Sequence, residues 1–274
     1  MKKKTSKLTT LLLVLILLVG LSLLLYPSFS DYWNSFHQSR AISRYAEQVA
    51  MLDGNQYEDL WEAAADYNAS LVERLNSYVL TEEQEASYDQ LLNVSGNGVM
   101  GYIEIPSIQC SLPIYHGTDE GVLQIAVGHV DWTSLPVGGE STHSVLSGHR
   151  GLPSARLFTD LDKLGLGDVF MLRVLDEVLT YEVDQILIVE PHETTELQIV
   201  EGKDYCTLVT CTPYGVNSHR LLVRGHRIEN LAEAKVIHVT SDAVQIEPMI
   251  VASAIAIPVL LVLFVVMMLP RRKK

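Results

Sequence analysis

Two long apolar runs lie near the ends of the chain. The first, Leu11–Leu25, is interrupted only by Gly20 and Ser22, and together with Tyr26 and the residues before it reaches about the 20 residues that cross a bilayer as a helix. The second, Met249–Leu269, has 21 residues and no charge. Each run predicts a membrane-spanning helix.

Basic residues flank both runs on their outer sides: Lys2, Lys3, Lys4 and Lys7 before the first, and Arg271, Arg272, Lys273 and Lys274 after the second. The positive-inside tendency predicts that both termini are cytosolic and that the sequence between the runs is exported. Two interpretations of the first run stay open, a retained anchor or a signal peptide cleaved at the small-x-small sequence Ser28–Ser30. In both, the second run tethers the exported part to the cell membrane.

The pattern between the runs changes from helical to β-like. From about Asp31 to Tyr88, apolar residues recur every three or four positions, and Gly54-Asn55 predicts a break between two helices. From Asn93 onward, short runs rich in β-branched residues alternate with Gly, Pro and Asn. These predicted strands are Val99–Ile105, Ser144–Leu146, Val169–Leu175, Val178–Val189, Tyr205–Thr210 and Leu221–Ile228. With no long helices between them, the runs predict a mainly β domain, an antiparallel sheet or a closed barrel, rather than a doubly wound α/β fold.

The predicted organisation therefore has five parts. Residues 1–26 form a cytosolic tail and the N-terminal membrane segment, and residues 27–90 form an extracellular helical segment. Residues 91–230 form the β domain, 231–248 a stalk, and 249–274 a C-terminal transmembrane helix with a basic cytosolic tail.

The charges of the exported part exclude one class of partner. The whole chain has a formal charge of −13, and the eight terminal bases leave 12 bases against 33 acids between Pro27 and Pro248, a net charge of −21. A surface this acidic repels phosphate backbones, so we expect no nucleic-acid binding. The apolar fraction of 48% excludes a disordered chain.

Three cysteines in an exported domain cannot all be paired. Cys206 and Cys211 are five residues apart in a predicted strand, so their side chains point to opposite faces and cannot form a disulfide with each other. Cys110 could pair only across the fold. At least one thiol should therefore be free outside the cell.

Cys211 is the candidate nucleophile. A β run ends at this residue, a turn-rich loop follows, and a second run begins at Arg220, so antiparallel pairing would set Cys211 opposite Arg220. An arginine there can lower a thiol pKa or donate hydrogen bonds to an oxyanion. The alternative is that Cys211 is a small buried apolar residue and Arg220 a surface cation.

His149 is the candidate acid/base. It lies between Gly148 and Gly151, just after a predicted strand, where an imidazole can be exposed, although a histidine beside glycines can also be a turn residue. Imidazole titrates near neutral pH, so it can protonate a leaving amine and deprotonate an attacking one. Four further histidines, His116, His129, His143 and His226, lack the spacing of a zinc site, and neither a metal nor a cofactor is expected.

Thr207-Leu208-Val209-Thr210-Cys211, with Arg220 nine residues later, resembles the TLxTC…R signature of the sortases. The resemblance covers about Leu91 to Ile228 and includes further matching segments: Asn93–Gly98, Gly101–Pro106, Leu112–Gly117, Leu135–Gly139 and Ser147–Gly151. The paired membrane segments and the helical lead-in are similar to class C, the pilin-polymerising sortases of Gram-positive bacteria.

This resemblance implies a closed eight-stranded sortase barrel and roles for three residues. Cys211 would be the nucleophile, His149 the general acid/base and Arg220 the oxyanion-stabilising or substrate-positioning group. The implied reaction cleaves an LPXTG-like sorting signal between Thr and Gly through a thioacyl enzyme and joins it to a pilin lysine. The implied partners are pilin subunits, and the acidic ectodomain favours lysine-presenting surfaces.

Two other functions stay open. A housekeeping sortase would attach proteins to peptidoglycan, and a non-catalytic tethered module would only bind sorting signals. One departure from class C concerns the lid, because Ser77–Glu83 has no Asp-Pro-aromatic motif. The sequence therefore identifies no autoinhibitory residue.

Overall fold

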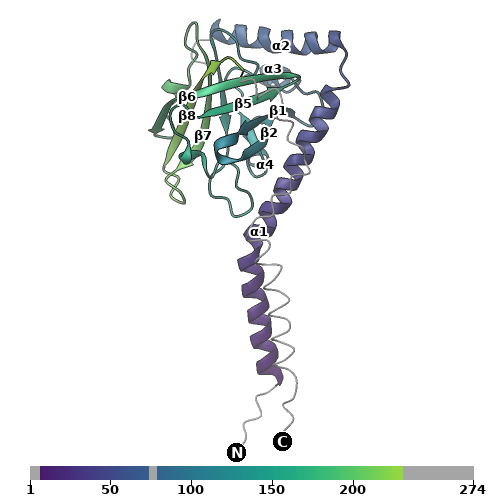
Figure 1. Cartoon of the computed structure of the whole chain (residues 1–274), viewed down its shortest axis with the longest axis vertical. Coiled ribbons are helices and arrows are strands. Elements are labelled where there is room, and N and C mark those ends of the chain that lie inside the picture. Colours follow the sequence, from purple (N-terminus) through teal and green to yellow (C-terminus); the bar gives the residue numbers. More distant parts are fainter. Residues whose placement is uncertain (1–6, 74–78, 231–274) are drawn as a thin grey trace, which may run out of the picture.

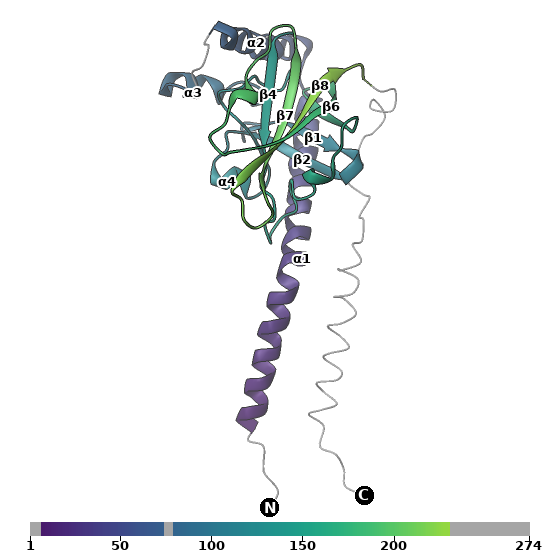
Figure 2. The same cartoon turned by 90° about the vertical axis from the view of Figure 1, so that its left-hand side faces the viewer.

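The computed structural model describes residues 7–73 and 79–230. A long helix, α1 (Lys7–Val49), rises past one side of a β-barrel, and α2 (Gly54–Glu73) crosses the upper end of that barrel (Figure 1). Figure 2 shows the lower half of α1 extending well below the barrel. The apolar run of the N-terminal region is therefore the free end of a helix whose other half packs on the barrel.

Helix α1 is the membrane candidate among the described residues. It is long and apolar enough to cross a bilayer, and none of its apolar window is buried in the protein. It continues through Pro27 without a break, so one helix joins the apolar run to the helical segment that follows it. The predicted stalk and the apolar run Met249–Leu269 lie outside the described residues.

The β domain is a closed barrel with the order β1-β2-β3-β4-β7-β8-β6-β5. Its strands are β1 (Val99–Ile105), β2 (Cys110–His116), β3 (Val127–His129), β4 (Thr142–Ser147), β5 (Val169–Val174), β6 (Glu177–Val189), β7 (Asp204–Thr212) and β8 (His219–Ile228). The closed eight-stranded barrel is thereby confirmed. Two neighbouring pairs, β2 with β3 and β4 with β7, are parallel, and the others are antiparallel.

Short connecting elements complete the chain. They are α3 (Glu82–Tyr88), α4 (Glu120–Leu123) and the 3-10 turns Pro106–Ile108, Leu161–Lys163 and Thr195–Leu197. Figure 1 shows α4 at the lower end of the barrel, opposite the end that α2 crosses.

The sequence pattern did not predict two of the strands, β2 and β3. β2 contains Pro113 and has no clear alternation, and β3 has only three residues, so neither resembles an independent strand. Both exist because their neighbours in the barrel supply hydrogen bonds. This outcome is typical of strands that tertiary pairing stabilises more than local propensity does.

The helical segment also differs from the prediction. The break after α1 precedes Gly54, because Asp53 accepts a hydrogen bond from the Gln56 amide (2.9 Å) and Gln56 accepts one from the Asp53 amide (3.2 Å). Thr81 and Gln84 form the same reciprocal arrangement at the start of α3. Such capping boxes begin helices, so the segment holds a third, separate helix that periodicity alone did not reveal.

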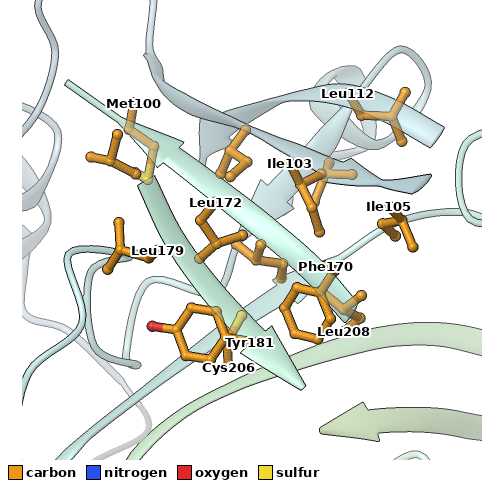
Figure 3. Packing of buried hydrophobic residues seen from close by; sticks show 14 of the residues in the cluster. Met100, Ile103, Ile105, Leu112, Phe170, Leu172, Leu179, Tyr181, Cys206 and Leu208 are labelled. Carbon is orange, nitrogen blue, oxygen red and sulfur yellow. The ribbon is translucent and has the colours of Figure 1, made fainter. Parts of the chain in front are cut away.

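The barrel interior is filled by alternate residues of its strands (Figure 3). Phe170 and Tyr181 stack there with ring centroids 5.5 Å apart, and Cys206 is fully buried among the same cluster. Gly225 permits this packing, because a Cβ at that position would lie 2.7 Å from the Phe170 ring. The hydrophobic core therefore fills the inside of the barrel, so a reactive site has room only on the outer face.

Helix α1 is fixed to the barrel by polar contacts along its upper half. The Asn34 amide donates to the Ser154 carbonyl (2.8 Å), and Gln38 donates to the Ile125 carbonyl (2.7 Å). Further up, the Tyr45 hydroxyl donates to the Met100 carbonyl and accepts from the Leu175 amide. These contacts span the barrel from one end to the other.

Helix α2 is fixed to the loop between β3 and β4 by Asn68. Its side-chain amide donates to the Leu135 carbonyl (3.1 Å), and its side-chain oxygen accepts from the Leu135 amide (2.7 Å). Both groups are buried, so the asparagine satisfies backbone atoms that water cannot reach.

Replacing Asn68 by alanine should lower the free energy of unfolding by about 2 kcal/mol. The variant leaves two buried backbone groups unsatisfied, each of which costs roughly 1–3 kcal/mol if the site does not relax. Chemical denaturation measures the change, with Asn55→Ala at the exposed start of α2 as the matched control. Equal stability of the two variants would show that Asn68 does not hold α2 in place.

Candidate active site

Cys211 lies on the outer face of the barrel, near the end of β7. Cys206 and Leu208 of the same strand belong to the interior cluster, whereas Val209 belongs to a separate outer cluster, so the alternation of the strand directs Cys211 outward. Cys211 is partly exposed, and all three cysteines are free thiols. The predicted opposite faces of Cys206 and Cys211 and the predicted free thiol are both confirmed.

Arg220 is the cross-strand partner of Cys211 in the antiparallel β7–β8 pair. The loop between them turns tightly, because the Val216 and Asn217 amides both donate to the Pro213 carbonyl. The Arg220 guanidinium donates from Nη1 to the His219 carbonyl (3.1 Å) and the Asn217 carbonyl (3.4 Å). These bonds hold the guanidinium at the mouth of the loop and leave Nε and Nη2 for another acceptor.

His149 comes to the same end of the barrel through the parallel pairing of β4 with β7. The last pair in this register is Ser147 with Val209, and two further bonds continue it. The Gly148 amide donates to the Val209 carbonyl (3.0 Å), and the Thr210 hydroxyl donates to the Gly148 carbonyl (2.7 Å). Continued by two residues, the register would pair His149 with Cys211. Three neighbouring strands thus lead the three predicted residues to the same end of the barrel.

The backbone of His149 is also fixed from below. Its carbonyl accepts from the Phe158 amide (3.1 Å), and the Phe158 ring packs against Gly148 so closely that a Cβ there would lie 2.7 Å away. A larger residue at position 148 would displace either the ring or the strand end. The glycine before His149 is therefore a packing requirement of the site.

Two residues that the sequence did not single out line the same region. Arg150 forms an ion pair with Asp162, and its guanidinium lies over the Tyr214 ring at 5.9 Å. Arg150 also donates from Nη1 to the Thr212 hydroxyl (3.4 Å), so it links the segment after β4 to the end of β7. Arg150 and Tyr214 therefore tie the His149 segment to the loop that follows Cys211.

An apolar cluster on the outer face leads up to Cys211. Its buried members are Val145, Leu197 and Leu222, and the partly buried residues packed against them are Val130, Trp132, Leu187, Val189 and Val209. Val209 precedes Cys211 by two residues on β7, and Leu222 follows Arg220 by two on β8, so both share the outward face with the candidate catalytic groups. Only the partly buried members, Val209 among them, offer apolar surface near the thiol. Sequence analysis missed it because the strand residues follow ordinary alternation.

A buried histidine holds the β6–β7 loop over this cluster. His143 donates from Nδ1 to the Gln198 carbonyl (2.8 Å), a group that only accepts, so Nε2 accepts from the Thr207 hydroxyl (2.7 Å). Burial lowers the pKa of His143 to about 4. His129, which donates to the Ser134 carbonyl and pairs with the Tyr88 hydroxyl, is also fully buried, and burial lowers its pKa to about 4.

These two histidines should make the barrel less stable in acid. Unfolding exposes imidazoles of pKa about 6.5, so the unfolded state binds more protons between pH 6.5 and pH 4. Their contribution is therefore complete above about pH 6.5, falls as the pH drops, and levels off below pH 4. Each amounts to about 3 kcal/mol at most.

Thermal unfolding of the wild type at pH 7 and pH 4.5, compared with His143→Gln, measures this effect. The variant should lose part of the pH dependence, whereas His192→Gln, at an exposed histidine, should keep all of it. Identical pH profiles for wild type and His143→Gln would contradict the assignment.

No group of three or more His, Cys, Asp and Glu residues that could hold a metal ion occurs within residues 7–73 and 79–230.

The comparisons with known proteins identify the family of the barrel domain. The sortase-domain family model matches residues 103–228. Sortase C1 from Streptococcus agalactiae superposes with a TM-score of 0.69 at 53% identity, covering 70% of this chain and 100% of that one. Sortase C from Clostridium perfringens, solved with the C-terminal cell wall sorting motif, superposes with a TM-score of 0.62 at 46% identity. That match covers 70% of this chain and 100% of the other.

Curated relatives are more distant. Sortase D of Bacillus subtilis is 33% identical over 47% of this chain, and the match spans 63% of the length of that protein. Sortase A of Streptococcus agalactiae is 27% identical over 74% of this chain and 77% of its own. Since the candidate site residues lie inside the matched range 103–228, and a sortase structure is 53% identical and fully covered by this chain, the chain belongs to the sortase family of cysteine transpeptidases.

Proposed function

We propose that this protein is a membrane-anchored class C sortase that polymerises pilins on the cell surface. The meeting of Cys211, His149 and Arg220 at the ends of three neighbouring strands carries this proposal. The likeness to sortase C structures supports the class, including that of Streptococcus pneumoniae, which was described for its catalysis and pilin substrate specificity (44% identity, TM-score 0.61, covering 70% of this chain and 97% of that one).

In the first half-reaction, the Cys211 sulfur attacks the carbonyl carbon of Thr in an LPXTG-like signal. The thiolate is the nucleophile, so the thiol proton passes to His149 before or during attack. The new S–C bond turns the carbonyl oxygen into an oxyanion, which Arg220 stabilises with its free N–H donors. His149 then protonates the Gly nitrogen, the C–N bond breaks, and the C-terminal remainder leaves.

The second half-reaction reverses these roles. A pilin lysine amine attacks the thioester carbonyl while His149 takes the proton from its nitrogen. Arg220 again stabilises the oxyanion, the C–S bond breaks, and an isopeptide bond joins the two pilins. His149 thus serves as acid in one half and base in the other, which requires it to lie beside the sulfur.

The outer apolar cluster supports peptide binding at this position. Val209, two residues from the thiol on the same face, is only partly buried, whereas Leu222 and Leu197 are buried. An apolar side chain of the signal that packs against Val209 would fix the scissile bond over Cys211. The net charge of the exported part, −21 between Pro27 and Pro248, favours basic, lysine-presenting pilin surfaces as acceptors.

No lid residue is assigned. The segment Ser77–Glu83 lacks the Asp-Pro-aromatic motif. Within it, Val79 is exposed, Leu80 packs against the core, and Glu82 begins α3.

Intact mass spectrometry of the protein incubated with a pilin that carries its sorting signal tests the proposal. We expect an acyl adduct on Cys211, followed by pilin–pilin crosslinks through lysine. An adduct that only water or short peptidoglycan amines resolve would favour the housekeeping function instead. Signal binding without any adduct would favour a non-catalytic module. Crosslinking rates that do not fall as salt rises would remove the electrostatic part of the proposal.

A further inference from the structure

Helix α1 carries a line of large exposed aromatic side chains just beyond its apolar run. Tyr26, Phe29, Trp33 and Phe36, here called the aromatic stripe, follow one another at intervals of three or four residues. Between 49% and 67% of each residue is exposed. Phe29 and Trp33 stack along the helix with centroids 6.5 Å apart. Such spacing places all four on one face of the helix.

The aromatic stripe faces away from the barrel. The residues that bind the barrel are Asp31, which accepts from the Arg156 amide, and Asn34, Gln38 and Tyr45. At 3.6 residues per turn these positions lie on the side of α1 nearly opposite the stripe. No part of the described chain covers the stripe.

The composition around the stripe indicates lipid. Its first member, Tyr26, ends the apolar run, so the stripe continues the surface that would contact a bilayer. Tyr and Trp are enriched at the membrane–water interface, where the rings sit among the headgroups. Arg40 and Arg44 follow on the same side, with the Arg40 guanidinium 5.2 Å from the Phe36 ring centroid. Two exposed cations here, on an otherwise acidic ectodomain, match anionic headgroups.

We propose that the aromatic stripe of α1 lies in the headgroup region of the cell membrane. The proposal rests on the membrane anchoring included in the proposed function. Tyr26, Phe29 and Trp33 fall within the headgroup layer, and a tilt of α1 toward the stripe brings Phe36 and Arg40 to its outer edge. The barrel then lies on the upper side of the tilted helix.

This contact orients the candidate active site. The contacts along α1 run from Asp31 and Asn34, which bind the loop after His149, to Tyr45, which binds the opposite end of the barrel at Met100 and Leu175. The barrel end with His149, Cys211 and Arg220 therefore points toward the membrane. With 1.5 Å per residue, Asp31 and Asn34 lie roughly 7–12 Å above Tyr26. The thiol is thus presented to substrates that are still bound at the membrane surface.

Fluorescence of Trp33 in the full chain tests the proposal. The variant Trp61→Phe/Trp132→Phe leaves Trp33 as the sole tryptophan, and it is reconstituted in vesicles of phosphatidylcholine and phosphatidylglycerol with or without brominated lipid. We expect Trp33 to lose most of its emission to brominated lipid and to resist aqueous iodide. The matched control moves the tryptophan to the exposed position of Met51 (Trp33→Phe/Met51→Trp on the same background). Its emission should be quenched by iodide and not by brominated lipid.

Quenching of Trp33 by iodide but not by brominated lipid would overturn the proposal. So would protection from both quenchers together with crosslinking between chains, which would mean that a second copy covers the stripe. A mature chain that begins after Ser30, measured by intact mass, would also overturn it.

Activity separates this proposal from the proposed function. Phe29→Ser/Trp33→Ser should cleave a soluble signal peptide at the wild-type rate and a lipid-tethered peptide several-fold more slowly. Equal rates on both peptides would contradict the membrane contact while leaving the function intact. Absence of cleavage of the soluble peptide by the wild type would contradict the function, and the quenching result would still stand by itself.

Discussion

Cys211→Ala should abolish both thioester formation and pilin crosslinking. Without the sulfur no acyl-enzyme can form, because His149 and Arg220 only transfer protons and stabilise the oxyanion in the proposed reaction. We expect the rate of acyl transfer to fall at least ~10⁴-fold, as it does when a nucleophile is removed from other acyl-transfer sites. Loss of the adduct in the intact mass and of crosslinks on a denaturing gel measures this.

Cys110→Ala is the matched control for that experiment. Cys110 is a partly buried strand residue whose thiol pKa is raised to about 12 by burial, so it is a poor nucleophile. Its removal should leave adduct formation unchanged. Crosslinking that survives in Cys211→Ala, or disappears in Cys110→Ala, would assign the reaction to another group. Retained signal binding by Cys211→Ala would show that the variant is folded.

Arg173→Met should destabilise the barrel by about 3–5 kcal/mol, because it leaves a buried charge without its partner. Arg173 of β5 donates from Nε to Oε2 of Glu104 on β1 at 2.7 Å, and both side chains are nearly fully buried. The other carboxylate oxygen of Glu104 already lacks a hydrogen-bond partner. We therefore expect a fall of the thermal midpoint of ~10 °C in detergent micelles.

The double variant Glu104→Met/Arg173→Met distinguishes the cost of the orphaned charge from a loss of packing. Replacement of a whole buried ion pair by apolar side chains is often neutral or stabilising, so the double variant should recover most of the lost stability. A double variant as unstable as Arg173→Met would mean that the arginine acts through packing instead.

The sequence predicted the fold where local patterns are strong. β1 begins and ends where alternation indicates, and β6 is only one residue longer than predicted. β2 and β3 could not be found, because their hydrogen-bond partners, not their own residues, make them strands. The capping boxes at Asp53 and Thr81 were visible in the sequence and would have located the starts of α2 and α3.

The site was predictable only in part for a similar reason. Strand parity and a short loop place Cys211 opposite Arg220, and this required no knowledge of the rest of the barrel. The position of His149 depends on parallel pairing between strands 62 residues apart, as in the Thr210–Gly148 bond, and no hydrophobic pattern encodes such a pairing. Only the resemblance to sortases implied it. The apolar cluster beside the thiol likewise exists only once four strands are side by side.

The parallel pairing of β4 with β7 also ties the candidate site to the completion of folding. Parallel strands far apart in sequence associate late and slowly, so the end of β4 reaches the end of β7 only at a late stage. Until then, the candidate acid/base His149 is not held at the strand end that carries Cys211. Under the proposed function, closure of the barrel therefore switches the thiol on, with folding in the part that proteolysis plays in a zymogen.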